Sequence, residues 1–245
     1  MNELDFTGKT VLVVGGSSGI GNAIAQAFHA NGAEVHVWGT RPKVEDYHGE
    51  DGSDLNGLFY AQVDVSDTAS ITRFEQSFRK LDILVQSQGI VVYKRGEFEQ
   101  EGWDKVINVN LNSLRACAMK FHEHLAAAKG SMIIISSTAG FQSTKGNPAY
   151  SASKAGAVAL TKTLGEAWAR DGISVNGIAP GFVATKLTRV TTENPQRLEL
   201  AESRIPIGRM GLASEMAGPA LFLASSLASY MVGQTLIVDG GLTLP

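Results

Sequence analysis

Seven short apolar runs, rich in β-branched residues, alternate along the chain with longer amphipathic segments. The runs lie at residues 9–14, 34–38, 58–65, 81–86, 131–136, 173–178 and 234–240. Each run is almost continuously apolar, which is typical of strands covered on both faces. The segments between them predict helices over 20–31, 67–79, 99–128, 151–171 and 213–227. This alternation predicts an α/β fold, a doubly wound parallel sheet of about seven strands with helices on both faces.

The chain length fits one such domain. The 245 residues are many for a single sheet domain but too few for two complete ones, and no Pro-rich or Ser-rich linker divides them. We therefore expect one domain over residues 1–245. Residues 182–208 form a long charged excursion between the sixth strand and the last helix. Long excursions within compact domains are often binding loops, so this segment is predicted to bind substrate.

Composition and charge exclude several classes of protein. A net charge of −3 provides no basic surface for a nucleic acid. No stretch reaches membrane-spanning length, and the N-terminus carries acids where a signal peptide carries basic residues. A cytoplasmic protein with neither a nucleic-acid nor a membrane partner is expected. Cys117 is the only cysteine, so a disulfide within the chain and a thiolate zinc site are excluded, and no metal is expected.

A glycine-rich turn follows the first predicted strand and opens the first predicted helix. Its sequence, GGSSGIGNAIAQAF, has the spacing G-x-x-x-G-x-G. Glycines let a backbone approach a ligand closely, and a helix N-terminus offers N–H groups and a positive dipole to a pyrophosphate. The alternative is an ordinary glycine-rich connection. We favour dinucleotide binding, with the candidate residues Gly15, Ser17, Ser18, Gly19, Ile20 and Gly21.

The end of the second predicted strand bears on which dinucleotide binds. An acid there would accept hydrogen bonds from the adenosine ribose and repel a 2′-phosphate. The sequence has Gly39, Thr40 and Arg41 instead. NADP(H) is therefore favoured, with Thr40 and Arg41 near the 2′-phosphate, while NAD(H) stays possible if Arg41 is only a solvated loop residue. Asp64 either accepts from the adenine amine or caps the next helix.

Residues 150–154, YSASK, place a Tyr and a Lys four apart at the start of a predicted helix, on one face. An ammonium near Tyr150 is expected to lower the pKa of its phenol, so that Tyr150 exchanges protons as a general base or acid. The alternative is a packed Tyr and a surface Lys. Ser137 ends the fifth strand, where its hydroxyl can bond a substrate oxygen. Asn110 lies within a long predicted helix. Asn is unfavourable in a helix interior, so its side chain is expected to have a specific local role.

These residues resemble the short-chain dehydrogenase/reductase family, specifically its compact single-domain branch with a Rossmann-like fold. The resemblance runs from about Lys9 to Gly241 and rests on several motifs in one order. They are the glycine turn, Asp64-Val65, NVNL at 108–111, Ser137, YSASK, PGFVAT at 180–185 and VDGG at 238–241. It implies a catalytic tetrad of Asn110, Ser137, Tyr150 and Lys154, in which Asn110 anchors a water that links Lys154 to solvent.

The resemblance also implies cofactor contacts and an assembly. Tyr150 and Lys154 would contact the cofactor as well, and so would Val65, Gly89, Pro180, Gly181, Val183 and Thr185. A homotetramer formed through the helices near 99–128 and 151–171 is typical of the family. Their small residues suit close packing.

Three parts of the sequence depart from the family pattern. Val14 replaces the usual Thr, and QSQG at 86–89 replaces Asn-Asn-Ala-Gly, which changes both sides of one contact beneath the cofactor. We predict an intact turn in which the Gln86 and Gln88 amides replace the lost bonds. Ser18 stands where many NADP-preferring relatives carry a basic residue, so the NADP prediction depends on Arg41.

The resulting hypothesis is an NAD(P)H-dependent enzyme that interconverts a ketone and a secondary alcohol. Residues 90–94, Phe141, Gln142 and the 182–208 loop are expected to line the substrate pocket. A 3-oxoacyl thioester reductase is the leading specific option, and a dehydrogenase of a small polyol, sugar or hydroxylated ring is the runner-up. A cofactor-binding sensor or scaffold without turnover is the alternative of another class. The four intact tetrad residues argue against it.

Overall fold

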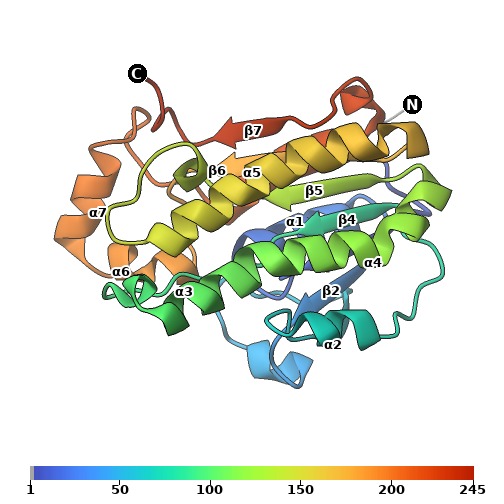
Figure 1. Ribbon diagram of the computed structural model, residues 1–245, viewed down its shortest axis with the longest axis horizontal. Helices are drawn as coiled ribbons and strands as arrows, with labels where there is room; N and C mark the ends of the chain where they lie inside the picture. Colours follow the sequence, from blue (N-terminus) through green and yellow to red (C-terminus); the bar gives the residue numbers. More distant parts are fainter. Residues whose placement is uncertain (1–2) are drawn as a thin grey trace.

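The computed structural model describes residues 3–245 and contains one seven-stranded sheet (Figure 1). The strand order is β3-β2-β1-β4-β5-β6-β7, and every neighbouring pair is parallel. The strands are β1 (Thr10–Val14), β2 (Glu34–Gly39), β3 (Phe59–Gln62), β4 (Ile83–Gln86), β5 (Ser131–Ile135), β6 (Ser174–Pro180) and β7 (Thr235–Val238). Each of them falls on one of the seven apolar runs, which confirms the predicted α/β class.

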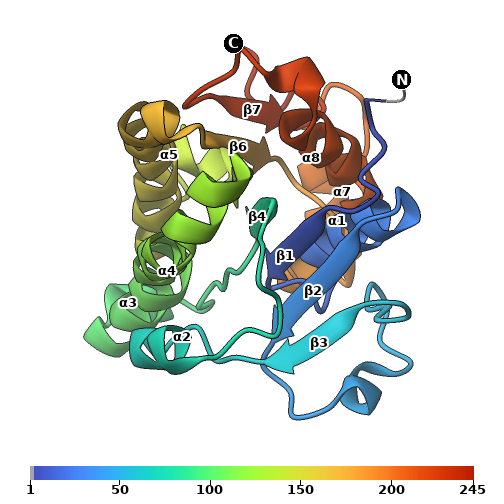
Figure 2. The ribbon, with the colours of Figure 1, turned by 90° about the vertical axis from the view of Figure 1, so that its right-hand side faces the viewer.

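The sheet is buried on both faces, and this explains the continuous apolar runs. In β1, Val11 and Val13 join one core while Leu12 and Val14 join the other, and all four side chains are 0% exposed. The helices α1 (Gly19–Ala30) and α8 (Ala217–Ala224) cover the first face. The helices α4 (Ser113–Ala128) and α5 (Pro148–Trp168) cover the second. Figure 2 shows the two layers on either side of the sheet.

The helix α2 (Thr68–Arg73) is shorter than the predicted 67–79. Its end is fixed by tertiary contacts: the Lys120 ammonium donates to the Phe74 carbonyl at 2.7 Å. The Phe74 ring packs edge-on against Trp38, with 5.1 Å between centroids. The helix therefore ends at Arg73 although the helical pattern of the sequence continues, because Phe74 packs against Trp38. Helix propensity does not take such tertiary contacts into account.

The predicted helix over 99–128 is interrupted. The structure has α3 (Gln100–Ile107), then a π-helical turn over Asn108–Asn112, then α4. Such single-turn π insertions occur often at functional sites, because they add a residue and redirect a side chain. Asn110 lies in this turn and not in a regular helix.

The strand order reverses between β1 and β4, the adjacent strands whose connections run to opposite sides. In open parallel sheets a crevice forms at the carboxyl ends of the strands at this switch point. The segment after β6 reaches over that edge and contains two short helices, α6 (Arg189–Thr192) and α7 (Pro195–Glu202). Among residues 3–245 no helix combines the length and the apolar character needed to cross a membrane.

Candidate active site

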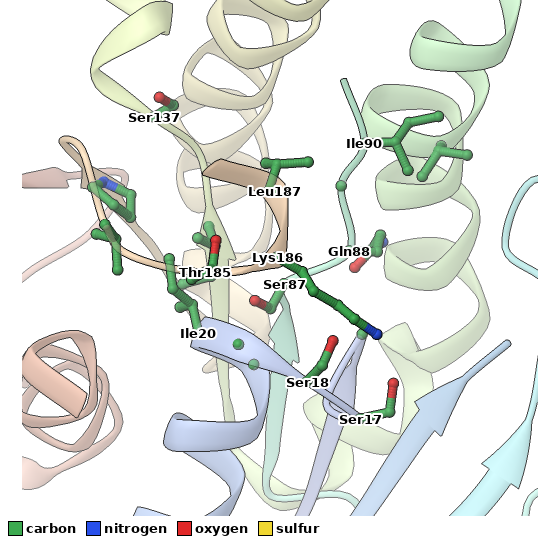
Figure 3. Close-up of a pocket in the computed structure, with 18 of the residues that line it drawn as sticks. Ser17, Ser18, Ile20, Ser87, Gln88, Ile90, Ser137, Thr185, Lys186 and Leu187 are labelled. Atoms are coloured by element: carbon green, nitrogen blue, oxygen red, sulfur yellow. The ribbon is translucent and has the colours of Figure 1, made fainter. Parts of the chain in front are cut away.

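A cleft of about 370 Å³ lies at the carboxyl edge of the sheet (Figure 3). The glycine turn, the ends of β4 and β5, the start of α5 and the loop after β6 all contribute to its walls. Of the residues predicted from sequence, those that line it are Gly15, Ser17, Ser18, Gly19, Ile20, Gly21, Thr40, Val65, Gly89, Ser137, Tyr150, Lys154, Pro180, Gly181, Val183 and Thr185. Arg41, Asp64 and Asn110 are not among the lining residues.

At two glycines of the turn the backbone has a positive φ and lies close to other segments that line the cleft. Gly15 has φ +75°, and a Cβ there would lie 2.8 Å from the Gln88 backbone nitrogen. Gly19 has φ +58°, and its Cβ would point across the cleft, 3.5 Å from Thr185 Cγ2. Ser18, which precedes α1, makes no side-chain bond to the first turn of that helix. The turn and the helix N-terminus therefore fit the pyrophosphate of a dinucleotide.

Tyr150 and Lys154 lie together at one end of the cleft, as the four-residue spacing predicts. The Lys154 ammonium is 5.7 Å from the centroid of the Tyr150 ring. Lys154 is only 4% exposed, and its Nζ donates to the Ile135 carbonyl at 3.0 Å. Burial lowers the pKa of Lys154 to about 8. A lysine so placed is held by the backbone of β5 and titrates near physiological pH.

The phenol of Tyr150 departs from the sequence expectation. Its pKa is raised, chiefly by burial. A hydrogen bond with Ser137 lowers the pKa, while the nearby Tyr93 and Glu97 raise it further. The expected lowering by Lys154 is not found, because that ammonium is itself desolvated and bonded to Ile135. The Tyr150 phenol therefore favours the protonated form, which suits a proton donor.

The Asn110 side chain is hydrogen-bonded to the backbone and does not line the cleft. This side chain is 0% exposed, and its Oδ1 accepts from the Ile90 amide at 2.8 Å. Its Nδ2 donates to the Ile90 carbonyl at 2.9 Å and to Ser153 Oγ at 3.2 Å. The π-helical turn thus ties the segment after β4 to the α5 helix that carries Tyr150.

Glu97 is a buried carboxylate that sequence reasoning missed. It is 0% exposed, and its Oε2 accepts from the Tyr150 amide at 2.9 Å. Its Oε1 accepts from the Val92 amide and from Asn147 Nδ2, each at 3.1 Å. The carboxylate therefore holds the start of α5 against the loop after β4. Nothing in GEFEQ distinguishes this Glu from its exposed neighbour Glu99.

The altered turn beneath the cleft is intact, as predicted. The Ser87 amide donates to the Val14 carbonyl at 2.9 Å, so a backbone bond bridges the two changed segments. The glutamine amides do not replace bonds to Val14 as expected. Gln88 Nε2 donates instead to Ser113 Oγ of α4 at 3.0 Å and to Gln86 Oε1 at 3.3 Å, and Gln86 Nε2 donates to Met132 Sδ at 3.3 Å. Gln88 Oε1 is buried without a hydrogen-bond partner.

Near the end of β2, where the adenosine of a dinucleotide is expected, Arg41 has protein partners. Thr40 lines the cleft, but the Arg41 guanidinium pairs with Glu50 and donates to the Asp46 carbonyl. Lys186, which sequence reasoning missed, lines the cleft from the loop after β6 and bonds the other oxygen of Glu50. Figure 3 shows the Lys186 side chain extended toward the turn of Ser17 and Ser18.

Asp64 is exposed and lies outside the cleft. Its carboxylate accepts from the Ser66 amide at 2.9 Å, and α2 is capped by Asp67, which accepts from the Ala69 amide at 2.9 Å. The capping interpretation of Asp64 is therefore wrong, because Asp67 caps α2 and Asp64 bonds within the tight turn at 64–67. The contact of Asp64 with the adenine amine stays a prediction.

Some of the residues expected to line a substrate pocket line the cleft, and others do not. Leu187 and Thr188 line the cleft together with Ile90, whereas Phe141 and Gln142 do not. The Tyr93 hydroxyl donates to the Leu187 carbonyl at 2.6 Å and so joins the two loops. Within residues 3–245 no group of three or more His, Cys, Asp or Glu side chains is placed to hold a metal ion.

Comparison with known proteins gives matches over the whole chain. A family profile described as Enoyl-(Acyl carrier protein) reductase matches residues 14–243. A 3-oxoacyl-(acyl-carrier-protein) reductase from Chlamydia pneumoniae is 39% identical, over 98% of this chain and 99% of that protein. A 2-dehydro-3-deoxy-D-gluconate 5-dehydrogenase from Bacillus subtilis is 38% identical, over 98% and 96%. A gluconate 5-dehydrogenase from Burkholderia cenocepacia, solved with NADP and tartrate, has a TM-score of 0.87 and 31% identity, over 99% of each chain.

Proposed function

The chain belongs to the short-chain dehydrogenase/reductase family of oxidoreductases, and we propose that it interconverts a ketone and a secondary alcohol with NADP(H). One arrangement carries this proposal: Tyr150, Lys154 and Ser137 lie at one end of a cleft whose other end is a glycine turn suited to a dinucleotide. A sensor without turnover has no need of a buried lysine beside a proton-donating phenol.

The chain's own side chains supply the proton chemistry. When bound, the nicotinamide supplies or accepts the hydride. In reduction, the Ser137 hydroxyl bonds the carbonyl oxygen, where negative charge develops, and the Tyr150 phenol donates its proton to that oxygen. The raised pKa of Tyr150, due first to burial, keeps this proton in place at neutral pH. We propose that Lys154 holds the nicotinamide ribose, while Asn110 fixes the backbone of Ile90.

The preference for NADP(H) is supported by two cations at the adenosine end, Arg41 and Lys186, although Glu50 is shared between them. The Burkholderia structure, solved with NADP, supports the same cofactor. NAD(H) is the alternative. Thr40, together with the residues of the glycine turn, Val65, Gly89 and the 180–185 segment, is proposed to contact the dinucleotide.

For the substrate, we favour a 3-oxoacyl thioester, supported by the reductase from Chlamydia pneumoniae. The apolar side chains of Ile90 and Leu187 at the substrate end fit an acyl chain. Oxidation or reduction of a sugar acid is the second candidate, because the Bacillus dehydrogenase is almost equally similar. In both cases the 182–208 segment is proposed to be the substrate-binding loop of one domain.

We further propose a cytoplasmic homotetramer. Apolar side chains that a partner copy could cover lie on α4, in β7 and just before β7: Met119 is 45% exposed, Ile237 44% and Leu227 58%. Burial of these side chains between copies would account for them. Light scattering at micromolar concentration should give the mass of four chains, and a monomer mass would contradict this assembly.

The function is tested by following NADPH absorbance with the purified protein across a panel of 3-oxoacyl thioesters, keto sugar acids, simple ketones and an enoyl thioester. Turnover with a ketone, but not with the enoyl thioester, supports the proposal. Turnover only with the enoyl thioester would overturn the ketone assignment. Repeating the assay with NADH tests the cofactor preference separately.

A further inference from the structure

The loop after β2 folds back across the adenosine end of the cleft and presents one carboxylate, Glu50, to two cations. Its Oε1 pairs with Arg41 Nη2 and its Oε2 pairs with Lys186 Nζ. The hydrogen bonds from Lys186 and then from Arg41 lower the pKa of Glu50. Arg41 follows β2, while Lys186 follows β6. This single carboxylate therefore links the segment after β2 to the segment after β6.

Hydrogen bonds to the start of α1 hold the loop just after Glu50. The Gly19 amide donates to the Gly52 carbonyl at 2.8 Å. The Asp54 amide donates to Asn22 Oδ1 at 2.9 Å, and Asn22 Nδ2 donates to the Asp54 carbonyl at 2.6 Å. The loop is thus fastened to the start of α1 just beyond Glu50.

The position of the ion pairs of Glu50 with Arg41 and Lys186 bears on which cofactor binds. In doubly wound sheets the adenosine ribose lies at the carboxyl end of the second strand, and a cation there accommodates a 2′-phosphate. Thr40 and Lys186 line this part of the cleft. A phosphate dianion prefers the same guanidinium and ammonium groups that Glu50 engages. The carboxylate and the phosphate therefore have the same partners.

We propose that Glu50 is a specificity-determining residue that competes with the cofactor 2′-phosphate for Arg41 and Lys186 and so narrows the preference for NADP(H) over NAD(H). This inference rests on the proposed dinucleotide function. A cofactor with a free 2′-hydroxyl leaves both ion pairs in place. A cofactor with a 2′-phosphate must exchange Glu50 for its own charge.

The test isolates the 2′-phosphate by titration calorimetry with adenosine 2′,5′-bisphosphate and with 5′-AMP. Binding to the unchanged protein is compared with binding to Glu50→Gln and to a matched control, Asp51→Asn, an exposed acid next in sequence. The two ion pairs of Glu50 are partly exposed, so each contributes little free energy. Because Glu50→Gln removes the competing charge, this variant should bind the bisphosphate about three- to tenfold more tightly. Its affinity for 5′-AMP should change by less than about twofold. Asp51→Asn should alter the ratio of the two affinities by less than about twofold.

A second variant separates contact from overall charge. Glu50→Asp keeps the charge but is one methylene too short to reach both cations, so it should shift the ratio in the direction of Glu50→Gln. An unchanged ratio in Glu50→Gln, or weaker bisphosphate binding, would overturn the inference. Failure of both ligands to bind the unchanged protein would instead overturn the dinucleotide function. The two failures are therefore distinguishable.

Discussion

The two ends of the cleft are built on opposite principles. At the catalytic end, around Tyr150, these polar groups are buried and hydrogen-bonded: Lys154 is 4% exposed, and Asn110 and Glu97 are 0% exposed. At the adenosine end, the side chains of Arg41, Glu50 and Lys186 are 34%, 22% and 36% exposed. A buried polar group without its partner is costly, so the catalytic geometry has one arrangement. Exposed charges exchange partners at small cost, which suits recognition of alternative cofactors.

Apart from the loss of the Tyr150 phenol itself, the largest effect is expected at Ser137, whose hydroxyl is proposed to bond the substrate oxygen. Ser137→Ala removes the hydroxyl that bonds the developing oxyanion and that lowers the pKa of Tyr150. Turnover should fall by roughly 10²- to 10³-fold with cofactor affinity retained. Ser136→Ala is the matched control, since Ser136 also lines the cleft but donates to the Ile178 carbonyl at 3.2 Å. A larger loss in the control would show that the wrong serine has been assigned.

Glu97→Ala tests whether burial makes the catalytic end rigid. The substitution leaves the Tyr150 and Val92 amides and Asn147 Nδ2 without their acceptor. The free energy of unfolding should drop by roughly 3 kcal/mol, measured by urea denaturation. Glu99→Ala, at an exposed neighbour, should change it by less than about 0.5 kcal/mol. Equal losses in both variants would remove the contrast between buried and exposed acids.

The burial of Lys154 predicts that the free energy of unfolding depends on pH. Its pKa in the folded protein is about 8, below the ordinary value of 10.5, so the unfolded chain binds one more proton between these two pH values. This group's contribution to the free energy of unfolding should therefore rise with pH in that window, by roughly 3 kcal/mol in total. Lys154→Met should abolish the rise, whereas Lys162→Met, an exposed position on α5, should preserve it. Unfolding curves from pH 7 to 10.5 measure the difference, and identical slopes in the two variants would contradict the burial argument.

The smallest effect is expected at the exposed end. Arg41→Ala should weaken NADPH binding about three- to tenfold, because the partly exposed ion pair between Arg41 and the 2′-phosphate is lost. NADH has no 2′-phosphate, so its binding should weaken less than about twofold. The NADPH effect should shrink as salt is raised, since exposed charges are screened. Fluorescence titration at two ionic strengths provides the measurement. Equal weakening of both cofactors would mean that Arg41 does not read the 2′-phosphate.

The same contrast explains which features the sequence predicts. Tyr150, Lys154 and Ser137 are predictable, because a spacing of four on a helix and a position at a strand end place side chains in space. The partners of Arg41 are not, because Glu50 sits in an irregular loop and Lys186 is 136 residues from Glu50 along the chain. The π-helical turn at Asn110 and the early end of α2 also escape prediction, since both depend on tertiary contacts. The sequence also predicts an intact turn at Val14 and Gln88. It does not predict the hydrogen bond from the Gln88 amide to Ser113, because Ser113 lies in α4, far along the chain.

The account depends most on Tyr150 as the proton donor, and Tyr150→Phe tests it directly. The variant keeps the ring but loses the hydroxyl, so NADPH should bind within about twofold of the unchanged protein. Ketone reduction should fall by at least about 10²-fold, because general acid catalysis contributes that much. Turnover within tenfold of the unchanged protein, with normal NADPH binding, would contradict the proposed role of the phenol.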